Sequence, residues 1–250
     1  TYEQQRLYNL FVKHHRSPHM IIFGLDGEWC STAPMLEAFT FRPFPPWLYD
    51  DNPWNDALFL FNFSALEQAG RQFGFLTGLR APNYGRDGYT NFLPPADQYN
   101  LEKARSHIYG LSGAPSTSEI TEPQRNFSER RNSWSYPAHL RMRDMLARLP
   151  AQTVKILMFV PYHYAHLPSE ETIEWVRWDE CKYRLAMLTA DMPNAHIIDF
   201  MFPSVITMRD ENFWDALHYS EGVAEQLAEL INIGVSDRRG RTGFFKYIEF

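Results

Sequence analysis

The chain has 250 residues, of which 44% are hydrophobic and 22% are charged, and its formal net charge is -6. This composition excludes an intrinsically disordered chain, and no apolar run approaches the roughly 20 residues that a membrane-spanning helix needs. Because neutralising phosphates requires a basic surface, the negative charge argues against nucleic acid as the main partner. The length suits one large hydrophobic core or two small ones.

Three short apolar runs are predicted to form buried strands of a parallel sheet. Each run is too short for a buried helix, and each is too continuously apolar for a strand with one face in water. The first is rich in residues that favour strands, and the other two are soon followed by a proline. The runs cover residues 20–25, 154–160 and 195–200.

Helices are predicted before, between and after these strands. Apolar side chains recur at helical spacing over residues 2–16, 137–149 and 173–190. A further amphipathic stretch begins after Ser220 and Glu221, which are typical of a helix N-terminus. The alternation of helices and strands indicates an α/β fold with right-handed crossovers.

Residues 30–135 interrupt this alternation and are predicted to be a long irregular insertion between two strands. The stretch is dense in proline, glycine, asparagine and aromatic residues, with short helices at most, over residues 55–70 and 95–109. Insertions of this kind commonly shape a site. The aromatic side chains either bury against the sheet or form a carbohydrate-binding surface, and they include Trp47, Tyr49, Trp54, Phe59, Phe61, Phe63, Tyr84 and Tyr89.

The chain has two cysteines, Cys30 and Cys181. Two cysteines by themselves make neither a disulfide scaffold nor a zinc site. Each lies in an apolar context with helical or strand periodicity, which favours two buried free thiols. The alternative is a single long-range disulfide, if the protein resides in an oxidising compartment.

A carboxylate stands three residues before an imidazole in the segment Asn212-Phe-Trp-Asp-Ala-Leu-His-Tyr-Ser220. On a turn, this spacing brings the Asp215 side chain against Nδ1 of His218, which fixes the tautomer and leaves Nε2 as a general base. The alternative is an aspartate that caps a helix beside a structural histidine. Because the motif follows the last predicted strand, where α/β sites assemble, we favour the catalytic interpretation.

This last block combines a strand, a proline, a Trp-Asp-x-x-His-Tyr loop and an amphipathic helix, and it resembles the last block of the SGNH (GDSL-like) hydrolases. The closer resemblance is to the bacterial SGNH-like group that includes the alginate O-acetylation proteins. The resemblance covers roughly residues 1–30 and 150–233. Its further matching blocks are residues 2–6, 21–26, 159–163 and 197–200.

The resemblance implies a three-layer α/β/α, flavodoxin-like fold in which the three predicted strands are parallel neighbours, with the second in the middle. It implies serine-dependent chemistry on acyl (acetyl) esters of a polysaccharide, by hydrolysis or transfer, without a cofactor or a metal. His218 would then be the general base and Asp215 the residue that orients it. Gly24, Asp26 and His163 would lie at the substrate pocket.

Two parts of the family pattern are missing. The family's nucleophile is a serine in a Gly-x-Ser-type turn after the first strand, whereas this chain has no Gly-Asp-Ser or Gly-Thr-Ser. The glycine of the second block, whose backbone N–H helps to hold the oxyanion, is missing too. We therefore expect a fragment or an inactive remnant that lacks the first strands, with one partial domain over residues 1–234 and an irregular tail over 235–250.

The location and the assembly of the protein follow less directly. The resemblance implies an extracytoplasmic, periplasmic or membrane-attached protein, although the chain shows no secretion signal and no transmembrane segment. The expected partner is an acylated carbohydrate or a small acyl ester. The alternative function is a non-catalytic carbohydrate-binding or interaction domain, and the sequence indicates no oligomeric state.

Two other serines and a histidine pair offer weaker alternatives. Ser31 follows the first predicted strand, and Ser112 lies in Gly-Leu-Ser-Gly without a strand before it, so Ser112 lacks the context of a nucleophile turn. His163 and His166 stand three residues apart, but this spacing without further ligands makes a poor zinc site. We expect both histidines to line a pocket or to face solvent.

Overall fold

The computed structural model divides the chain into two compact units. The first, called the sheet unit below, comprises Thr1, Phe11–Leu36 and Asn100–Phe250, and the second comprises Tyr2–Leu10 and Glu37–Tyr99. The residues that the structure describes are 1–33, 50, 52–59, 62–81, 93–110, 133–170 and 172–249. Among them, no helix is long and apolar enough to cross a membrane.

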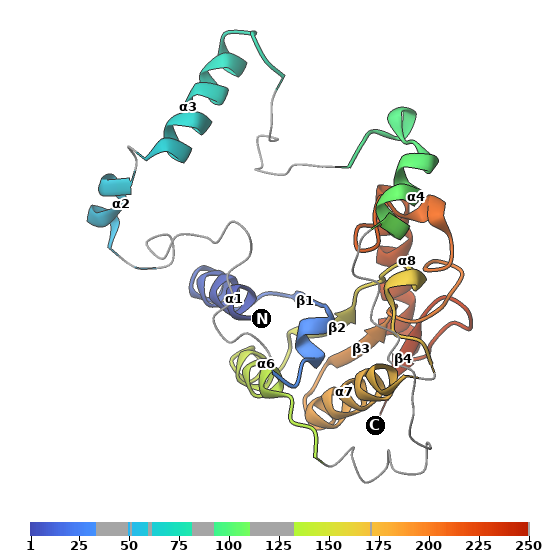
Figure 1. Cartoon of the computed structure of the whole chain (residues 1–250). Coiled ribbons are helices and arrows are strands. Elements are labelled where there is room, and N and C mark those ends of the chain that lie inside the picture. The colour runs from blue at the N-terminus through green and yellow to red at the C-terminus, as the bar shows by residue number, and fades with distance from the viewer. Residues whose placement is uncertain are drawn as a thin grey trace. The chain divides into compact units, whose positions relative to one another are not determined.

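The sheet unit is built on a four-stranded sheet with the order β1-β2-β3-β4 (Figure 1). β1 (Met20–Leu25), β2 (Val154–Phe159) and β3 (Ala195–Asp199) are parallel, and β4 (Lys246–Ile248) runs antiparallel to β3. The predicted strands, their parallel pairing and the central position of the second are therefore confirmed. The α/β class follows from the sheet and the helices around it.

The two faces of the sheet bury alternate residues of each strand, as strand geometry requires. Ile156 and Ile198 belong to one core cluster that includes Val223, Leu227, Leu230 and Ile231 of α8 (Glu221–Asp237). The opposite face is covered by α7 (Ile173–Thr189), whose Lys182 Nζ lies 5.2 Å from the centroid of the Phe159 ring. The sheet is thus packed between helices, and loops follow the ends of its strands (Figure 1).

The helices of the sheet unit begin at capping residues that the sequence displays. The Ser220 hydroxyl accepts from the N–H of Val223 at the start of α8, and the Thr172 hydroxyl accepts from the N–H of Trp175 at the start of α7. α6 (Pro137–Ala147) begins with a proline, which the first turn tolerates because no hydrogen-bonded N–H is needed there. These helices end within a few residues of the predicted ranges, and so does α1 (Tyr2–His14), of which Tyr2–Leu10 belongs to the second unit.

The second unit contains two helices where one was expected over residues 55–70. These are α2 (Pro53–Phe59) and α3 (Phe63–Leu76). The side chain of Asn62 accepts from the N–H of Ala65 and so starts a new helix at that point. The range 95–109 likewise divides into a 3-10 turn, η3 (Ala96–Gln98), and α4 (Leu101–Gly110), of which α4 belongs to the sheet unit.

The end of the chain is not an irregular tail. α8 continues to Asp237 and ends at Arg238, which adopts a left-handed conformation with φ 50°. The chain then turns and pairs β4 with β3, and Phe245 is buried in the α8 core cluster with 2% of its surface exposed. The prediction was wrong because a three-residue strand is too short to show a periodic pattern.

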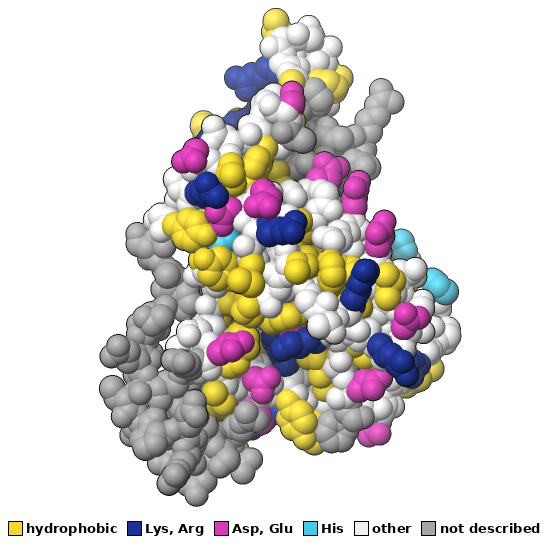
Figure 2. Space-filling view, turned by 90° about the vertical axis from the view of Figure 1, so that its right-hand side faces the viewer, with side chains coloured by type: hydrophobic (Ala, Val, Ile, Leu, Met, Phe, Trp, Pro, Cys, Tyr) yellow, Lys and Arg dark blue, Asp and Glu magenta, His cyan; other side chains and the backbone are white. Residues whose placement is uncertain are grey.

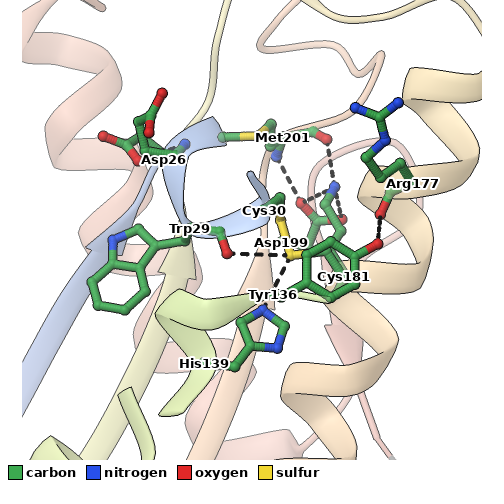
Figure 3. The surroundings of a disulfide bond; sticks show 11 residues. Asp26, Trp29, Cys30, Tyr136, His139, Arg177, Cys181, Asp199 and Met201 are labelled. Atoms are coloured by element: carbon green, nitrogen blue, oxygen red, sulfur yellow. Dashed lines mark hydrogen bonds and ion pairs between the residues drawn. A yellow bond between two sulfur atoms is a disulfide. The ribbon is translucent and has the colours of Figure 1, made fainter. Parts of the chain in front are cut away.

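The two cysteines form a disulfide rather than two free thiols (Figure 3). Cys30 ends the 3-10 turn η1 (Gly27–Cys30) after β1, and Cys181 lies on α7, with their Cα atoms 5.4 Å apart. Nε2 of His139 lies 3.4 Å from the Cys181 sulfur, and burial together with the charge of Arg184 lowers the pKa of His139 to about 4. The apolar periodicity around each cysteine is real, but it carries no information on which buried side chain meets which.

Candidate functional site

Residues that follow β1 and β2, the first turns of α7 and Leu217 border an open cleft of about 410 Å³. Asp26 comes directly after β1, Tyr162 follows β2, and Leu217 belongs to the loop that leads from β3 to α8. Parallel strands bring such residues to one edge of a sheet, where α/β proteins bind ligands. We call this space the strand-end cleft; its other described lining residues are Gly27, Glu28, Cys30, Ser31, His166, Pro168, Glu174, Arg177 and Trp178.

Asp215 and His218 form the predicted pair. The Asp215 carboxylate oxygens lie 2.7 and 2.9 Å from Nδ1 of His218. Oδ1 of Asp215 also accepts from the backbone N–H groups of Leu217 and His218, so the same carboxylate holds the turn and the imidazole. The predicted distance below about 3.5 Å is confirmed. With Nδ1–H donated to Asp215, neutral His218 carries its lone pair on Nε2.

The interaction between Asp215 and His218 shifts the pKa values of both side chains. The hydrogen bond from Asp215, reinforced by its negative charge and opposed by burial, raises the pKa of His218 above its usual value. Burial acts to raise the pKa of Asp215, but the hydrogen bonds from His218 and Leu217 outweigh it and lower the pKa. The His218 side chain is 47% exposed, so solvent or a ligand reaches the imidazole.

The loop that carries the pair is attached to the end of β2. The backbone N–H of His163 donates to the carbonyl of Ala216, and the N–H of Trp214 donates to the carbonyl of His218. Because Leu217 lines the strand-end cleft together with Asp26, the loop and the residue after β1 share one edge of the sheet. Asp26 was predicted to share this edge with Asp215 and His218; it shares it with Leu217, which lies between them, whereas neither Asp215 nor His218 is among the described residues that line the cleft.

α4 packs against the start of the same loop. Arg105 Nε and the Tyr109 hydroxyl donate to the two carboxylate oxygens of Asp210, at 2.7 and 2.8 Å. Asp210 begins the 3-10 turn η6 (Asp210–Asn212), five residues before Asp215. Nδ1 of His107 lies 3.3 Å from the carbonyl oxygen of Trp214. The α4 side chains therefore help to fix the conformation of the loop.

His163 was predicted to face the cleft, and this prediction is wrong. Its side chain is fully buried; Nδ1 accepts from the N–H of Ala165, so Nε2 carries the proton that is donated to Asp210 Oδ1 at 3.1 Å. Burial lowers the pKa of His163 and so favours the neutral ring, although the hydrogen bond and the charge of Asp210 act in the opposite direction. The preceding residue, Tyr162, lines the cleft instead, because successive side chains of an extended segment point to opposite sides.

Gly24 and Asp26 are separated by the end of β1. Gly24 lies inside the strand, paired with Met158, and is not among the described residues that line the cleft. Asp26 caps η1, where its side chain accepts from the N–H of Glu28 at 3.0 Å. Of the two, Asp26 is the one in position to meet a ligand.

Several cleft residues were missed in the sequence, and most lie on the first turns of α7. Glu174, Arg177 and Trp178 follow the loop after β2, and a helix N-terminus in an α/β fold lies near the strand ends. That rule was available from the predicted elements. Tyr162 was also missed; burial and the nearby Asp26 carboxylate raise its pKa to about 12, so its hydroxyl stays protonated.

The structure bears on some of the alternative sites: the two serines, the aromatic residues of the insertion and a metal site. Ser31 lines the strand-end cleft, and its hydroxyl accepts from the N–H of Ala33 at 3.3 Å. Ser112 lies outside the described residues, as do Trp47, Tyr49, Phe61, Tyr84 and Tyr89. Trp54 and Phe63 are 86% and 83% exposed, respectively. In the part of the chain that is described, no group of three or more His, Cys, Asp or Glu side chains is placed to hold a metal ion.

The face of the molecule shown in Figure 2 carries acidic and basic side chains interspersed with one another.

Comparison of the chain with family models, with curated proteins and with solved structures found no match in any of the three. The geometry of the strand-end cleft and of the Asp215–His218 pair is therefore what bears on function.

Proposed function

We propose that the protein cleaves or transfers acyl esters of carbohydrate at the strand-end cleft, in the manner of the SGNH hydrolases. His218 would be the general base and Asp215 the residue that orients it. The observation that carries the proposal is the carboxylate held 2.7 Å from Nδ1 of His218, on a loop whose Ala216 carbonyl accepts from the N–H of His163 beyond the end of β2. The half-exposed imidazole and the adjoining cleft support it further.

The chemistry follows from the tautomer that Asp215 selects. Nε2 of His218 would take the proton of a hydroxyl group as its oxygen attacks the acyl carbonyl carbon. The imidazolium formed would be stabilised by the Asp215 carboxylate, and it would return the proton to the departing alkoxide of the sugar. A serine performs the attack in the family that the sequence resembles, and Ser31 is the serine that lines the described part of the cleft.

The decisive test is the hydrolysis of an acetylated oligosaccharide by the protein as its gene encodes it. Removal of a general base costs about 10²–10⁴ in rate, so we expect His218→Ala to lower kcat/KM by at least about 10²-fold. Asp215→Asn is expected to cause a similar loss because it favours the wrong imidazole tautomer. Equal rates for the parent and His218→Ala proteins would refute the proposal.

The same comparison made on the 250 residues alone locates the nucleophile. No residue among them matches the family's nucleophile block, so a nucleophile outside this sequence would leave them hydrolysing nitrophenyl acetate no faster than their His218→Ala variant. Turnover that depends on His218 in this chain would show that it contains the nucleophile. Ser31→Ala would then be the first substitution to make, since Ser31 lines the cleft.

The disulfide supports an extracytoplasmic location for this activity. Disulfides persist in oxidising compartments and are rare in the cytosol. Cys30 lines the cleft and Cys181 lies on α7, which supplies other lining residues. Fractionation of the producing cells, with non-reducing electrophoresis of the recovered protein, tests this location.

A carbohydrate-binding role without catalysis is the second candidate. The observation in its favour is the exposure of Trp54 and Phe63 in the second unit. Exposed aromatic rings offer flat apolar faces with polar edges to a sugar. If binding alone is the function, Trp54→Ala should abolish oligosaccharide binding while His218→Ala changes nothing.

A further inference from the structure

The helix α3, labelled in Figure 1, carries four large apolar side chains on its surface. Phe63, Leu66, Phe73 and Leu76 are each between 57% and 83% exposed. Spacings of three and seven residues bring them to one side of the helix. We call these four residues the α3 row. Contiguous exposed apolar side chains of this kind mark surfaces where another molecule binds.

The α3 row is symmetric about its centre. The small residues Ala69 and Gly70 stand in the middle, with Leu66 three residues before Ala69 and Phe73 three residues after Gly70. The outer members stand three residues further out on each side, and they are Phe63 and Leu76. A two-fold interface between two copies of a chain requires such a self-complementary surface. A two-fold axis between Ala69 and Gly70 would set Leu66 of each copy beside Phe73 of the other.

The centre of the α3 row allows two helices to approach closely. Ala69 and Gly70 are both exposed. Beyond the chain neighbours and the helix backbone around Gly70, none of the residues that the structure describes has an atom within 4 Å of a Cβ built there. A glycine inside a helix is unfavourable relative to alanine, and small residues at a contact shorten the distance between packed helices. Close contact with a second helix would therefore give Gly70 a role.

An open groove of about 500 Å³ lies beside the α3 row. Gly70, Gly74, Leu79 and Arg80 are among its described lining residues. Phe63 stands on the same flank of the helix, seven residues before Gly70 and eleven before Gly74. In an antiparallel pair related by a two-fold axis, the same flank of each helix lies on the same side. The Phe63 ring of one copy would thus reach the groove of the other.

The charge of α3 favours a protein over a lipid surface. The helix has one carboxylate and one guanidinium, Glu67 and Arg71, which pair with each other at 2.8 Å. A helix that lies on a membrane surface has a polar face rich in lysine and arginine, which anionic lipids attract. The neutral α3 offers no such attraction, whereas a second copy meets the α3 row without a charge to bury.

The α3 row is large enough for a specific interface. An aromatic side chain buries about 150–250 Å², so the exposed parts of Phe63 and Phe73 in two copies amount to about 450–750 Å². Stable interfaces bury at least about 1,000 Å² in total. Leu66, Leu76 and the groove residue Leu79, which are also exposed, supply the remainder.

We propose that α3 is the interface of a homodimer, in which two copies of the helix pack antiparallel about a two-fold axis between Ala69 and Gly70. The proposal goes beyond the proposed function and does not rest on it, because it concerns the second unit alone. The dimer would cover Phe63, so the carbohydrate-binding alternative would depend on Trp54.

Cross-linking tests the position of the axis. A disulfide requires Cα atoms within about 7 Å of each other, which the proposed pair provides at position 69 beside the axis. We expect Ala69→Cys in the whole protein to give mainly the covalent dimer on mild oxidation with copper phenanthroline, as measured by non-reducing electrophoresis. Gln68→Cys, on the other side of the helix, should cross-link at least about tenfold more slowly. Equal cross-linking of the two variants, or none in either, would overturn the proposal.

Charge substitutions test the antiparallel register. Light scattering after gel filtration should give the whole protein twice the mass of one chain. Leu66→Glu and Phe73→Lys each place a charge in the interface and are expected to weaken the dimer at least about tenfold. The double variant Leu66→Glu/Phe73→Lys should restore it, because each new carboxylate then lies beside an ammonium of the other copy. In a parallel pair each substituted position would face itself, so a double variant without recovery would overturn the proposal.

Controls separate dimerisation from folding. Leu140→Glu makes the same change at an exposed leucine of α6 and should leave the mass unchanged, and circular dichroism verifies that each variant is folded. A monomeric parent protein would overturn the proposal, and two measurements would then show what the α3 row contacts instead. A lower melting temperature in Leu66→Glu would indicate packing within the same chain, and binding to vesicles of phosphatidylcholine and phosphatidylserine would indicate a lipid surface.

Discussion

The ionisation of His218 is governed by Asp215. The hydrogen bond and the charge of Asp215 raise the pKa of His218, and burial acts in the opposite direction. Its protonated form is therefore favoured in the folded protein, and the stability that this contributes is present below the unfolded pKa of about 6.5 and is lost as pH rises through the higher folded pKa. The base form that catalysis needs appears over the same rise in pH.

We expect Asp215→Asn to lower the pKa of His218, because the substitution removes the charge that favours the imidazolium. The measurement is an NMR titration of the His218 ring in the parent and variant proteins. Asp144→Asn, at an exposed position on α6, makes the same change of charge as a control. A His218 pKa that is unchanged in Asp215→Asn would contradict the ion pair.

Lys182 and Asp199 form a buried ion pair at the end of β3. Lys182 Nζ donates to both carboxylate oxygens of Asp199, at 2.9 and 2.8 Å, and to the carbonyl of Met201 at 2.7 Å. Burial lowers the pKa of Lys182, and Asp199 opposes this shift. All three donors of the ammonium are used, so the pair ties α7 to the sheet rather than offering a group to a ligand.

Removal of one partner should be costly because it leaves the other charge buried and unpaired. Lys182→Met is expected to lower the free energy of unfolding by about 3–5 kcal/mol. The double variant Lys182→Met/Asp199→Asn should recover much of the loss, since no uncompensated charge remains. Urea denaturation measures both, and a double variant no more stable than the single one would refute the explanation.

At the scale of the elements, the position of α8 depends on Gly234, which faces Ile198 of β3 and Phe245, the residue before β4. A Cβ atom at Gly234 would lie 2.9 Å from Cε2 of Phe245 and 3.1 Å from Cδ1 of Ile198. At Gly222, on the first turn of the same helix, none of the residues that the structure describes has an atom within 4 Å of such a Cβ. The two glycines therefore separate packing from helix propensity.

Gly234→Ala is expected to destabilise the protein by about 1–3 kcal/mol through overpacking, despite the better helix propensity of alanine. Gly222→Ala should instead be neutral or stabilise by up to about 1 kcal/mol, because it restricts the unfolded chain without a clash. Thermal unfolding of the two variants checks both signs. Equal effects at the two positions would show that α8 does not pack closely on β3 and β4.

Helix starts and strand positions were predictable because their causes are local. Ser220 and Thr172 cap helices that begin one residue later, and the three parallel strands fall where continuous apolar runs stand. β4 was not predictable, because its pairing with β3 depends on Phe245 filling a space against Gly234. That space exists only after α8 has packed on the sheet.

At the scale of the whole molecule, the disulfide joins two walls of the strand-end cleft. Cys30 belongs to the turn after β1 and Cys181 to α7, 151 residues further along the chain. A crosslink of this length restricts the unfolded chain strongly in the chain-entropy account. It also holds α7, with Glu174 and Arg177, against the residues that follow β1.

The double variant Cys30→Ala/Cys181→Ala is expected to lower the free energy of unfolding by about 2–5 kcal/mol. Guanidinium denaturation of the parent and variant proteins measures the difference. A thiol assay on the denatured, unreduced parent should find no free thiol. Reactive thiols in that assay would instead support the free-cysteine prediction made from the sequence.

The sequence by itself determined the α/β class, the positions of the three strands and of the helices between them, and the Asp215–His218 pair, because each depends on residues close together in the chain. The tertiary structure alone decided the contacts between distant segments. It buried His163 against Asp210, joined Cys30 to Cys181, and brought Glu174 and Arg177 into the cleft with Asp26. Local periodicity and spacing report which side chains turn inward, whereas the packing of whole elements decides which of them meet.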